Sequence, residues 1–453
     1  MSGLKLSKML KEIKIENREK YYIKTFGCQM NEFDSERISY LLENEGYERT
    51  ADIEKAKIIV INTCSVREKA DNRLYGHIGN LKALKTKKPE IIICIGGCTA
   101  QSLKEKIIDD FPYVDIVFGT GVVNNLPELI KKRKLLKQSL CDASLNDSHH
   151  NIYNFKRTYK FKAFIPVTIG CNNFCSYCIV PFVRGRERSI SSNDIIKTIN
   201  DLVLDGVIEV MLLGQNVNSY GYGLKDSLSF AELLEEISKI HGLERIRFMT
   251  SHPKDFSENI VRVIKNNKNI VKHIHLPLQA GSNKILELMN RKYSREDFIN
   301  LVSMIKKEIP GCTITTDIIV GFPGEDYKDF NDTLEIVKKL KFNRAFTFIY
   351  SKRKGTNAFE MPDSVPIEEK KKWFKELVDT QNNISYEENR KLVGRKFKVL
   401  VEGLSTKKGT ILEGRLENNT IVNFDGETDL IGKLIWVDIT DAKSFYLLGN
   451  ISK

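Results

Sequence analysis

The chain has 453 residues, of which 41% are hydrophobic, so it is long enough for several domains with buried cores. It contains no apolar run of about 18 residues and no apolar export signal, so we expect a cytoplasmic protein without a membrane partner. Its 71 basic and 59 acidic residues give a net charge of +12, which favours a polyanionic partner such as nucleic acid. Nine cysteines are too few for a disulfide framework in a chain of this length, so the thiols should be reduced and available to metal.

Residues 1–20 are rich in lysine and glutamate, and we expect a flexible basic amino terminus there. Residues 21–138 alternate apolar strands with helices, which predicts an open parallel α/β sheet covered on both faces. The expected strands are 21–26, 57–61, 90–95 and 115–118, and the expected helices are 35–45 and 68–84.

Three cysteines, Cys28, Cys64 and Cys98, each follow directly after one of these strands. We call them the strand-end trio. The carboxyl ends of parallel strands meet at one edge of a sheet, so these thiols should lie close together. The pattern predicts a three-thiolate site with one open corner, and three incidental small residues in tight turns are the alternative. Cys94 lies inside an apolar run and is interpreted as a buried small hydrophobic residue.

Residues 139–156 are polar and without period, which predicts a linker. Beyond them, Cys171, Cys175 and Cys178 fall within one short loop, and we call them the loop trio. Closed structural zinc sites usually take four ligands, and electron-carrying iron–sulfur clusters usually take four cysteines. Three cysteines therefore indicate a centre with one metal position open to a ligand that is not protein. A zinc site that borrows a distant fourth ligand is the alternative.

Residues 157–386 contain six expected strands separated by helices, which fits an incomplete (β/α)6 barrel. Active sites of such barrels collect at the carboxyl ends of the strands, so Gly214, Gln215 and Asn216, which follow the second strand, are candidates for the pocket. The expected strands are 164–168, 209–213, 245–249, 273–276, 313–320 and 344–350.

Three arginines, Arg184, Arg186 and Arg188, follow the loop trio closely in sequence. Beside an active-site mouth they would hold phosphates, and a solvated loop with an internal ion pair is the alternative. Residues 387–453 show short strands separated by turns, which predicts a small all-β barrel. Its early part is basic and includes Lys396 and Lys398, so we expect an RNA contact there, unless the barrel only packs on the core. No role is assigned to Cys141 or Cys312.

The loop trio, with Tyr177 before its last cysteine, resembles the signature of the radical S-adenosylmethionine (SAM) superfamily. The segments around the strand-end trio resemble the amino-terminal domain of the methylthiotransferases within that superfamily, and residues 387–453 resemble a TRAM domain, a module associated with RNA binding. The motifs that carry the resemblance are Gly27-Cys28-Gln29-Met30-Asn31, Asn62-Thr63-Cys64-Ser65-Val66-Arg67-Glu68 and Gly96-Gly97-Cys98-Thr99-Ala100-Gln101.

This resemblance implies two 4Fe-4S clusters, one on the loop trio with SAM on its open iron and an auxiliary one on the strand-end trio. It places Tyr177, Gly214, Gln215 and Asn216 near SAM. The implied architecture is an amino-terminal parallel α/β sheet, a central radical SAM barrel and a carboxy-terminal TRAM barrel. A flavodoxin- or ferredoxin-type electron donor and a sulfur source are expected as partners of a monomer.

The implied reaction is methylthiolation at C2 of N6-isopentenyladenosine next to the anticodon of tRNA. Two SAM molecules per turnover serve as radical source and as methyl donor. One alternative is a methylthiotransferase that modifies an aspartate of a ribosomal protein. Another is a non-catalytic iron–sulfur protein that binds RNA or carries electrons.

Overall fold

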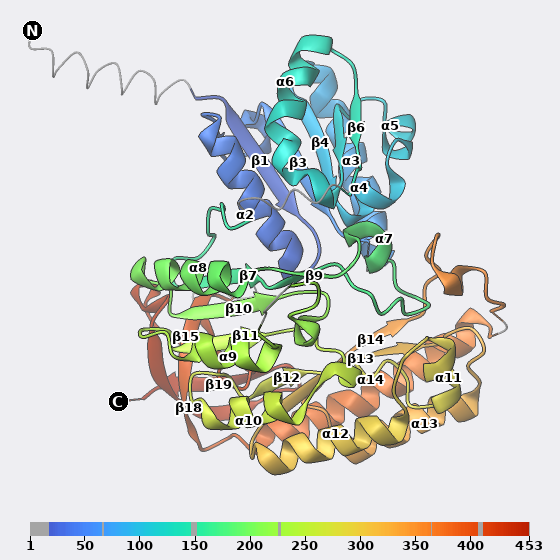
Figure 1. The fold of residues 1–453 in the computed structure, drawn as a ribbon, viewed down its shortest axis with the longest axis vertical. Helices are drawn as coiled ribbons and strands as arrows, with labels where there is room; N and C mark the ends of the chain where they lie inside the picture. The colour runs from blue at the N-terminus through green and yellow to red at the C-terminus, as the bar shows by residue number, and fades with distance from the viewer. Residues whose placement is uncertain are drawn as a thin grey trace, which may run out of the picture. The chain divides into compact units, whose positions relative to one another are not determined.

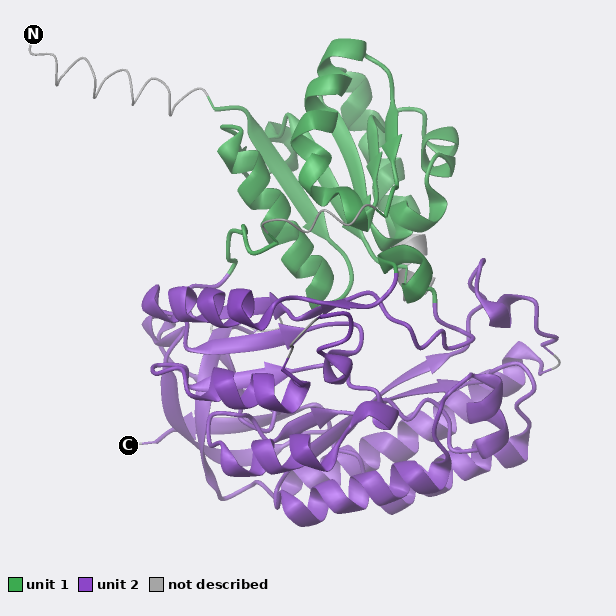
Figure 2. Ribbon diagram, viewed as in Figure 1, with its two compact units in different colours: residues 1–158, 179–185 green, residues 159–178, 186–453 purple. Residues whose placement is uncertain are grey.

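The computed structural model describes residues 18–65, 68–145, 152–224, 228–363, 365–405 and 411–452, with no side-chain detail for 68–73. Most of the expected flexible segment 1–20 and part of the expected linker 139–156 therefore lie outside the described residues. The chain divides into two compact units (Figure 2). Unit 1 comprises residues 1–158 and 179–185, and unit 2 comprises residues 159–178 and 186–453. Among the described helices, none has the length and apolar character needed to cross a bilayer.

Unit 1 contains a fully parallel six-stranded sheet, which confirms the predicted open α/β sheet. The strand order is β2-β1-β3-β4-β5-β6, so the order of the strands reverses between β1 and β3. Ligands of such sheets bind outside the carboxyl ends of the strands at this switch point. The strands are β1 (Lys20–Thr25), β2 (Glu48–Arg49), β3 (Ile58–Thr63), β4 (Ile92–Gly97), β5 (Ile116–Phe118) and β6 (Leu140–Asp142).

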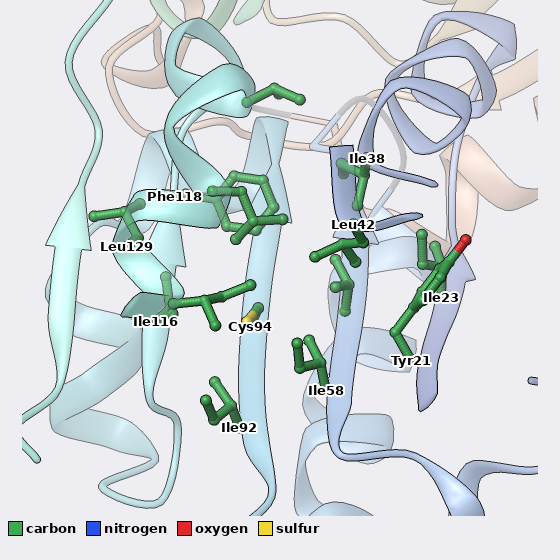
Figure 3. Close-up of a cluster of buried hydrophobic side chains, with 14 of the residues drawn as sticks. Tyr21, Ile23, Ile38, Leu42, Ile58, Ile92, Cys94, Ile116, Phe118 and Leu129 are labelled. Atoms are coloured by element: carbon green, nitrogen blue, oxygen red, sulfur yellow. The ribbon is translucent and has the colours of Figure 1, made fainter. Parts of the chain in front are cut away.

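Helices cover both faces of this sheet (Figure 1). On one face, α2 and α6 bury side chains such as Leu42 and Leu129 against Tyr21, Phe118 and Cys94, as Figure 3 shows. Each fully buried aliphatic or aromatic side chain contributes about 1.5–3 kcal/mol. Cys94 is completely buried in this core, as its apolar surroundings in the sequence indicated. The helices are α2 (Gln29–Asn44) and α6 (Leu126–Leu136) on this face, and α3 (Glu68–Lys87), α4 (Cys98–Leu103) and α5 (Lys106–Asp110) on the other.

Helix α2 begins six residues earlier than the expected 35–45, directly after Cys28. Its first turns look polar in sequence, but Met30 and Phe33 are buried together with Ile38 and Leu42. These positions recur every three to five residues and so continue one helical face. The polar residues Asn31, Asp34, Ser35 and Glu36 are buried too, which gives them a structural role at the sheet edge.

Unit 2 begins with six parallel strands in chain order, which confirms the predicted series of βα units. They form two three-stranded sheets, β7-β10-β11 and β12-β13-β14, with a parallel bridge between Ile246 and Ile270 beside β11. The strands are β7 (Lys162–Pro166), β10 (Glu209–Leu213), β11 (Arg245–Phe248), β12 (His273–His275), β13 (Thr313–Val320) and β14 (Arg344–Ile349). A short pair of strands, β8 (Thr168–Ile169) and β9 (Arg188–Ser189), flanks the loop trio.

The helices of unit 2 follow these strands along the chain (Figure 1). Three of them begin with a capping box. The side chain of the N-cap residue accepts from the backbone N–H three residues later, and the side chain of that later residue accepts from the N-cap backbone N–H. The helices are α8 (Ser192–Leu204), α9 (Phe230–Ser238), α10 (Glu258–Asn266), α11 (Asn283–Leu288), α12 (Arg295–Glu308), α13 (Tyr327–Leu340) and α14 (Ile367–Arg390).

The carboxy-terminal part of unit 2 is a closed five-stranded barrel, as predicted. Alternate side chains such as Val399, Leu412, Val422 and Phe424 fill its interior. The strands are β15 (Lys396–Leu404), β16 (Ile411–Leu416), β17 (Ile421–Asp425), β18 (Leu434–Ala442) and β19 (Tyr446–Ile451).

Two buried arginines of β11, Arg245 and Arg247, donate hydrogen bonds to backbone carbonyls of this barrel. The Nη2 atom of Arg245 donates to the carbonyl oxygen of Lys398 at 2.8 Å, and Nη2 of Arg247 donates to that of Leu416 at 2.9 Å. The charge of Arg247 is balanced by Glu209, whose Oε2 lies 2.8 Å from Nε. The barrel and the βα core are therefore joined by hydrogen bonds in a buried contact.

Candidate functional site

The strand-end trio lies at the carboxyl edge of the unit 1 sheet. Cys28 follows β1 and caps α2, Cys64 follows β3, and Cys98 is the first residue of α4 after β4. Cys28 is exposed, whereas Cys64 and Cys98 are buried. The trio therefore includes the switch point between β1 and β3, where the order of the strands reverses.

Two glycines bring the turns of this edge into direct contact. A Cβ atom on Gly27 would lie 2.6 Å from the Cβ and 3.1 Å from the Sγ of Cys64. A Cβ atom on Gly97 would lie 2.4 Å from the backbone oxygen of Thr63. Both glycines have positive φ angles, 129° and 91°, which residues with side chains rarely adopt. These turns hold the three cysteine-bearing segments close to one another.

Asn31 cross-links the edge from the first turn of α2, where it is fully buried. Its Nδ2 donates to the backbone oxygen of Thr63 at 2.6 Å. Its Oδ1 accepts from the thiol of Cys28 at 3.6 Å and from Nη2 of Arg184 at 3.2 Å. One amide therefore fixes β3, Cys28 and Arg184 relative to one another.

Arg184 lies within unit 1, although the sequence suggested a phosphate contact on a loop. It belongs to the short helix α7 (Val180–Arg184), is 7% exposed, and forms a 2.7 Å ion pair with the buried Asp34. Cys98 packs against Ile179 and Val183 of the same segment. Burial raises the pKa of the Cys98 thiol, and the neighbouring Arg184 opposes this rise. This placement favours a role for Arg184 beside the cysteines.

The loop trio lies between β8 and α7, with Cys171 and Cys175 buried and Cys178 half-buried. Backbone bonds hold the loop, since Ser176 donates to the carbonyl of Met289 at 3.0 Å. The side chain of Asn290 donates to the carbonyl of Phe174 at 2.9 Å, where Phe174 adopts a φ angle of 46°. Burial raises the pKa of the Cys171 thiol to about 11.

Arg291 is buried against this loop, and the sequence pattern did not single it out. Its Nη1 donates to Sγ of Cys175 at 3.3 Å and lies 3.5 Å from the hydroxyl of Tyr177. Its Nη2 donates to the carbonyl of Pro277 at 3.1 Å, and its Nε donates to the hydroxyl of Tyr293 at 3.0 Å. The guanidinium is thus held in one orientation, with one edge directed at a cysteine sulfur.

The residues predicted near SAM follow β10 and adjoin the loop trio. The side-chain oxygen of Gln215 accepts from the backbone N–H of Gly170, directly before Cys171, at 2.5 Å. Asn216 is 1% exposed, and its Nδ2 donates to Asp255 at 2.8 Å. Its Oδ1 is buried without a hydrogen-bond partner among the described residues. This oxygen is available to a ligand beside the loop.

The other basic residues predicted to contact the substrate differ in how exposed they are. Arg186 is exposed and stacks on the ring of Phe174 at 4.5 Å, and Arg188 lies on β9 opposite Ile169. Lys396 is exposed at the start of β15, whereas Lys398 forms a 3.1 Å ion pair with Glu244 of the βα core. Arg186 and Lys396 are therefore the more accessible candidates for a polyanion.

The thiolate donors of the two trios are of the kind that iron–sulfur clusters take. Within the described ranges, no three His, Cys, Asp or Glu side chains are gathered around a position for one ion. A cube of iron and sulfide accepts more widely spaced thiolates than one ion does, because each cysteine binds a different iron. The donor set of three thiolates leaves one iron for another ligand, and Arg291 supplies a sulfur-directed hydrogen bond of the kind that tunes such clusters.

Glu325, after β13, is 2% exposed and lacks a charged partner at one of its oxygens. Its Oε2 accepts from the backbone N–H of Gly321 and, at 3.1 Å, from that of Phe322. Its Oε1 is buried without a hydrogen-bond partner in the described part of the chain. Burial raises the pKa of Glu325 from 4.5 to about 7, although these backbone bonds oppose the rise. The carboxyl is thus held partly protonated near neutral pH.

We expect Glu325→Gln to raise the free energy of unfolding above that of wild type, and to do so more at pH 8 than at pH 5. The folded-state pKa lies above the unfolded value, so the stability contributed by the protonated form is present below about 4.5 and is lost as pH rises through about 7. Glutamine does not ionise, so the difference in free energy of unfolding between the variant and wild type should increase by on the order of 2–3 kcal/mol from pH 5 to pH 8. Urea denaturation of cluster-free protein at both pH values measures this. The exposed Glu376→Gln is the control, and an equal gain at both pH values would contradict the assignment.

Three family models match the chain. The models described as Uncharacterized protein family UPF0004, Radical SAM superfamily and TRAM domain match residues 20–119, 165–337 and 390–451. Among solved structures, the radical SAM methyltransferase TsrM from Kitasatospora setae has a similar fold, with a TM-score of 0.57 and 13% identity. This likeness covers 76% of the chain and 74% of that structure.

Curated relatives match over nearly the whole length. The tRNA-2-methylthio-N(6)-dimethylallyladenosine synthase of Acetivibrio thermocellus is 46% identical over 97% of this chain and 92% of its own. The protein of the same name from Clostridium tetani is 49% identical over 95% of this chain and 96% of its own. The similarity therefore extends over both units.

Proposed function

Because the chain belongs to the family of tRNA-2-methylthio-N(6)-dimethylallyladenosine synthases, we propose that it adds a 2-methylthio group to N6-dimethylallyladenosine in tRNA. It is a radical SAM methylthiotransferase that uses an iron–sulfur centre and SAM. The observation that carries the proposal is the presence of two separate trios of cysteines, one at the carboxyl ends of parallel strands of unit 1 and one in the loop that follows β7 and β8.

We assign one 4Fe-4S cluster to each trio. When bound, the cluster on the loop trio holds SAM and supplies the electron that splits it, while the auxiliary cluster supplies sulfur. Two SAM molecules per turnover are proposed, one as radical source and one as methyl donor. An aromatic C2–H has no useful acidity, so an ordinary general base cannot activate it, and radical chemistry is required.

The residues around the loop trio position these groups. Gln215 fixes the backbone of Gly170 and so orients the start of the cysteine loop. The free Oδ1 of Asn216 offers an acceptor to the amino-acid part of SAM. Tyr177 is held beside Arg291, whose Nη1 lies 3.5 Å from its hydroxyl. Burial of Cys171 and Cys175 keeps these two thiols away from solvent.

The substrate is tRNA, and we propose that exposed basic side chains hold its phosphates. Lys396 on the TRAM barrel and Arg186 beside the loop trio are the accessible candidates. Lys398 is engaged with Glu244, so its contribution should be smaller than Lys396. A flavodoxin- or ferredoxin-type protein as electron donor and a separate sulfur source complete the proposed set of partners of a monomeric enzyme.

Nucleoside analysis of tRNA tests the function directly. A strain that accumulates unmodified dimethylallyladenosine because its own enzyme is deleted should regain the 2-methylthio nucleoside when it expresses this chain. The Cys175→Ala chain is the matched control and should not restore it. An unchanged nucleoside profile beside a new methylthio-aspartate on a ribosomal protein would point to the alternative substrate.

A further inference from the structure

Each trio of cysteines has one buried arginine beside it, and the two arginines differ in their charge partners. Arg291 donates to Sγ of Cys175, and its other contacts are the carbonyl of Pro277 and the hydroxyls of Tyr293 and Tyr177. Within the described residues, no carboxylate forms an ion pair with it. In the described part of the chain, the charge of Arg291 is therefore not balanced by a paired carboxylate.

Arg184 next to the strand-end trio has a carboxylate partner. Its Nη2 lies 2.7 Å from Oδ2 of Asp34, and both side chains are only 6% exposed. The pair also touches Asn31, whose Oδ1 accepts from both Arg184 and Cys28. Arg184 beside the strand-end trio therefore has a paired carboxylate, whereas Arg291 beside the loop trio has none among the described residues. The buried Glu187, which lies near Cys171, does not form an ion pair with Arg291.

We propose that this difference directs the incoming electron, because Arg291 favours reduction of the centre on the loop trio and Asp34 cancels the equivalent effect of Arg184 on the strand-end trio. The inference rests on the proposed function, since it assumes a cluster on each trio. Adding an electron makes a cluster more negative, and a buried positive charge nearby lowers the cost of that step. Hydrogen bonds to cluster sulfurs act in the same direction.

The electron balance shows why such a bias is useful. One electron from the flavodoxin- or ferredoxin-type donor reaches the centre on the loop trio. With the centre and SAM bound, that electron would be consumed in reductive cleavage of the C5′–S bond of SAM, and the centre would return to its oxidised state. An electron delivered to the auxiliary centre would not cleave SAM. Arg291 thus acts indirectly, through its hydrogen bond to Cys175, by favouring the reduced state of the centre.

The first test measures the loop-trio centre alone, in a full-length chain whose strand-end trio is replaced by alanine. Redox titration followed by electron paramagnetic resonance gives the reduced fraction at each applied potential. Arg291→Gln should lower the ratio of reduced to oxidised centre about tenfold at a fixed potential, which is a shift of about 59 mV for one electron. Arg291→Lys keeps the charge and should restore most of this ratio. Lys292→Gln removes the same charge from an exposed neighbour and should change little.

The second test measures the strand-end centre in a chain whose loop trio is replaced by alanine. Asp34→Asn leaves the charge of Arg184 uncompensated and should raise the reduced fraction, whereas Asp34→Asn combined with Arg184→Gln should return it towards wild type. Iron content confirms loading of each variant. If Arg291→Gln binds no iron, the inference is tested by the midpoint potential of the strand-end centre in Asp34→Asn alone.

Two results would overturn the inference. One is an Arg291→Gln midpoint equal to that of Lys292→Gln. The other is an Asp34→Asn midpoint that does not rise. Neither measurement uses tRNA, so the inference and the assignment of the substrate can fail separately.

Discussion

Replacement of Cys175 by alanine should abolish cleavage of SAM. Cys175 is the buried central member of the loop trio, and Arg291 donates to its sulfur. In the proposed assignment, Cys175 is a ligand of the centre that supplies the electron, so its loss would remove one corner of that centre. We expect 5′-deoxyadenosine formation by reduced anaerobic protein to fall by at least about 10³-fold, equivalent to about 4 kcal/mol of barrier.

Cys28→Ala is the matched variant in the other trio. It should retain cleavage of SAM and lose the 2-methylthio product, because the strand-end trio is assigned to the sulfur-supplying centre. Cys312→Ala, a buried thiol outside both trios, controls for the loss of a cysteine. Liquid chromatography of 5′-deoxyadenosine and of the tRNA nucleosides from the same reaction gives both quantities. Retained cleavage in Cys175→Ala, or retained product in Cys28→Ala, would refute the division of roles.

Replacement of Arg247 by methionine should destabilise unit 2 by about 3–5 kcal/mol, because one member of a buried ion pair is removed. The side chains of Arg247 and Glu209 are 2% and 4% exposed, so the carboxylate left behind has little access to water. The carbonyl of Leu416 on the TRAM barrel loses its donor as well. Urea denaturation monitored by circular dichroism measures the loss.

Two controls separate the ion pair from general damage. Arg262→Met alters an exposed arginine of α10 and should stay within about 0.5 kcal/mol of wild type. Adding Glu209→Gln to Arg247→Met should recover about 1–3 kcal/mol, because the buried carboxylate that has lost its 2.8 Å partner and keeps only Arg245, at 3.9 Å, is removed. A fully additive double variant would show that the two side chains do not act as a pair.

Local patterns in the sequence were sufficient to predict the architecture and the grouping of the cysteines. Parallel strands are recognisable as apolar runs, and residues directly after such runs reach one sheet edge whatever the details of packing. This reasoning places Cys28, Cys64 and Cys98 together, and the structure shows their turns in contact. Likewise, five short strands separated by turns sufficed to predict a closed barrel.

The polar contacts within the site could not be predicted in the same way. Arg184 pairs with Asp34 over a separation of 150 residues, and Arg291 reaches Cys175 over 116 residues. An arginine in a polar stretch most often lies in solvent, so neither residue carries a local signal of burial. The hydrogen bond from Arg247 to the carbonyl of Leu416, which joins the barrel to the βα core, links residues 169 apart in sequence, so it could not be predicted for the same reason.

The segment 179–185 has a practical consequence for work with shortened forms of the protein. Unit 1 is discontinuous, since this segment belongs to it but follows Cys178 directly in the chain. A fragment ending at residue 158 would lack Ile179, Val183 and Arg184, leaving Cys98 uncovered and Asp34 without its cation. A fragment that begins after residue 158 would keep α7 but lose the unit 1 residues that it packs against, such as Cys98. We therefore expect division of the chain at residue 158 to disrupt packing in both fragments.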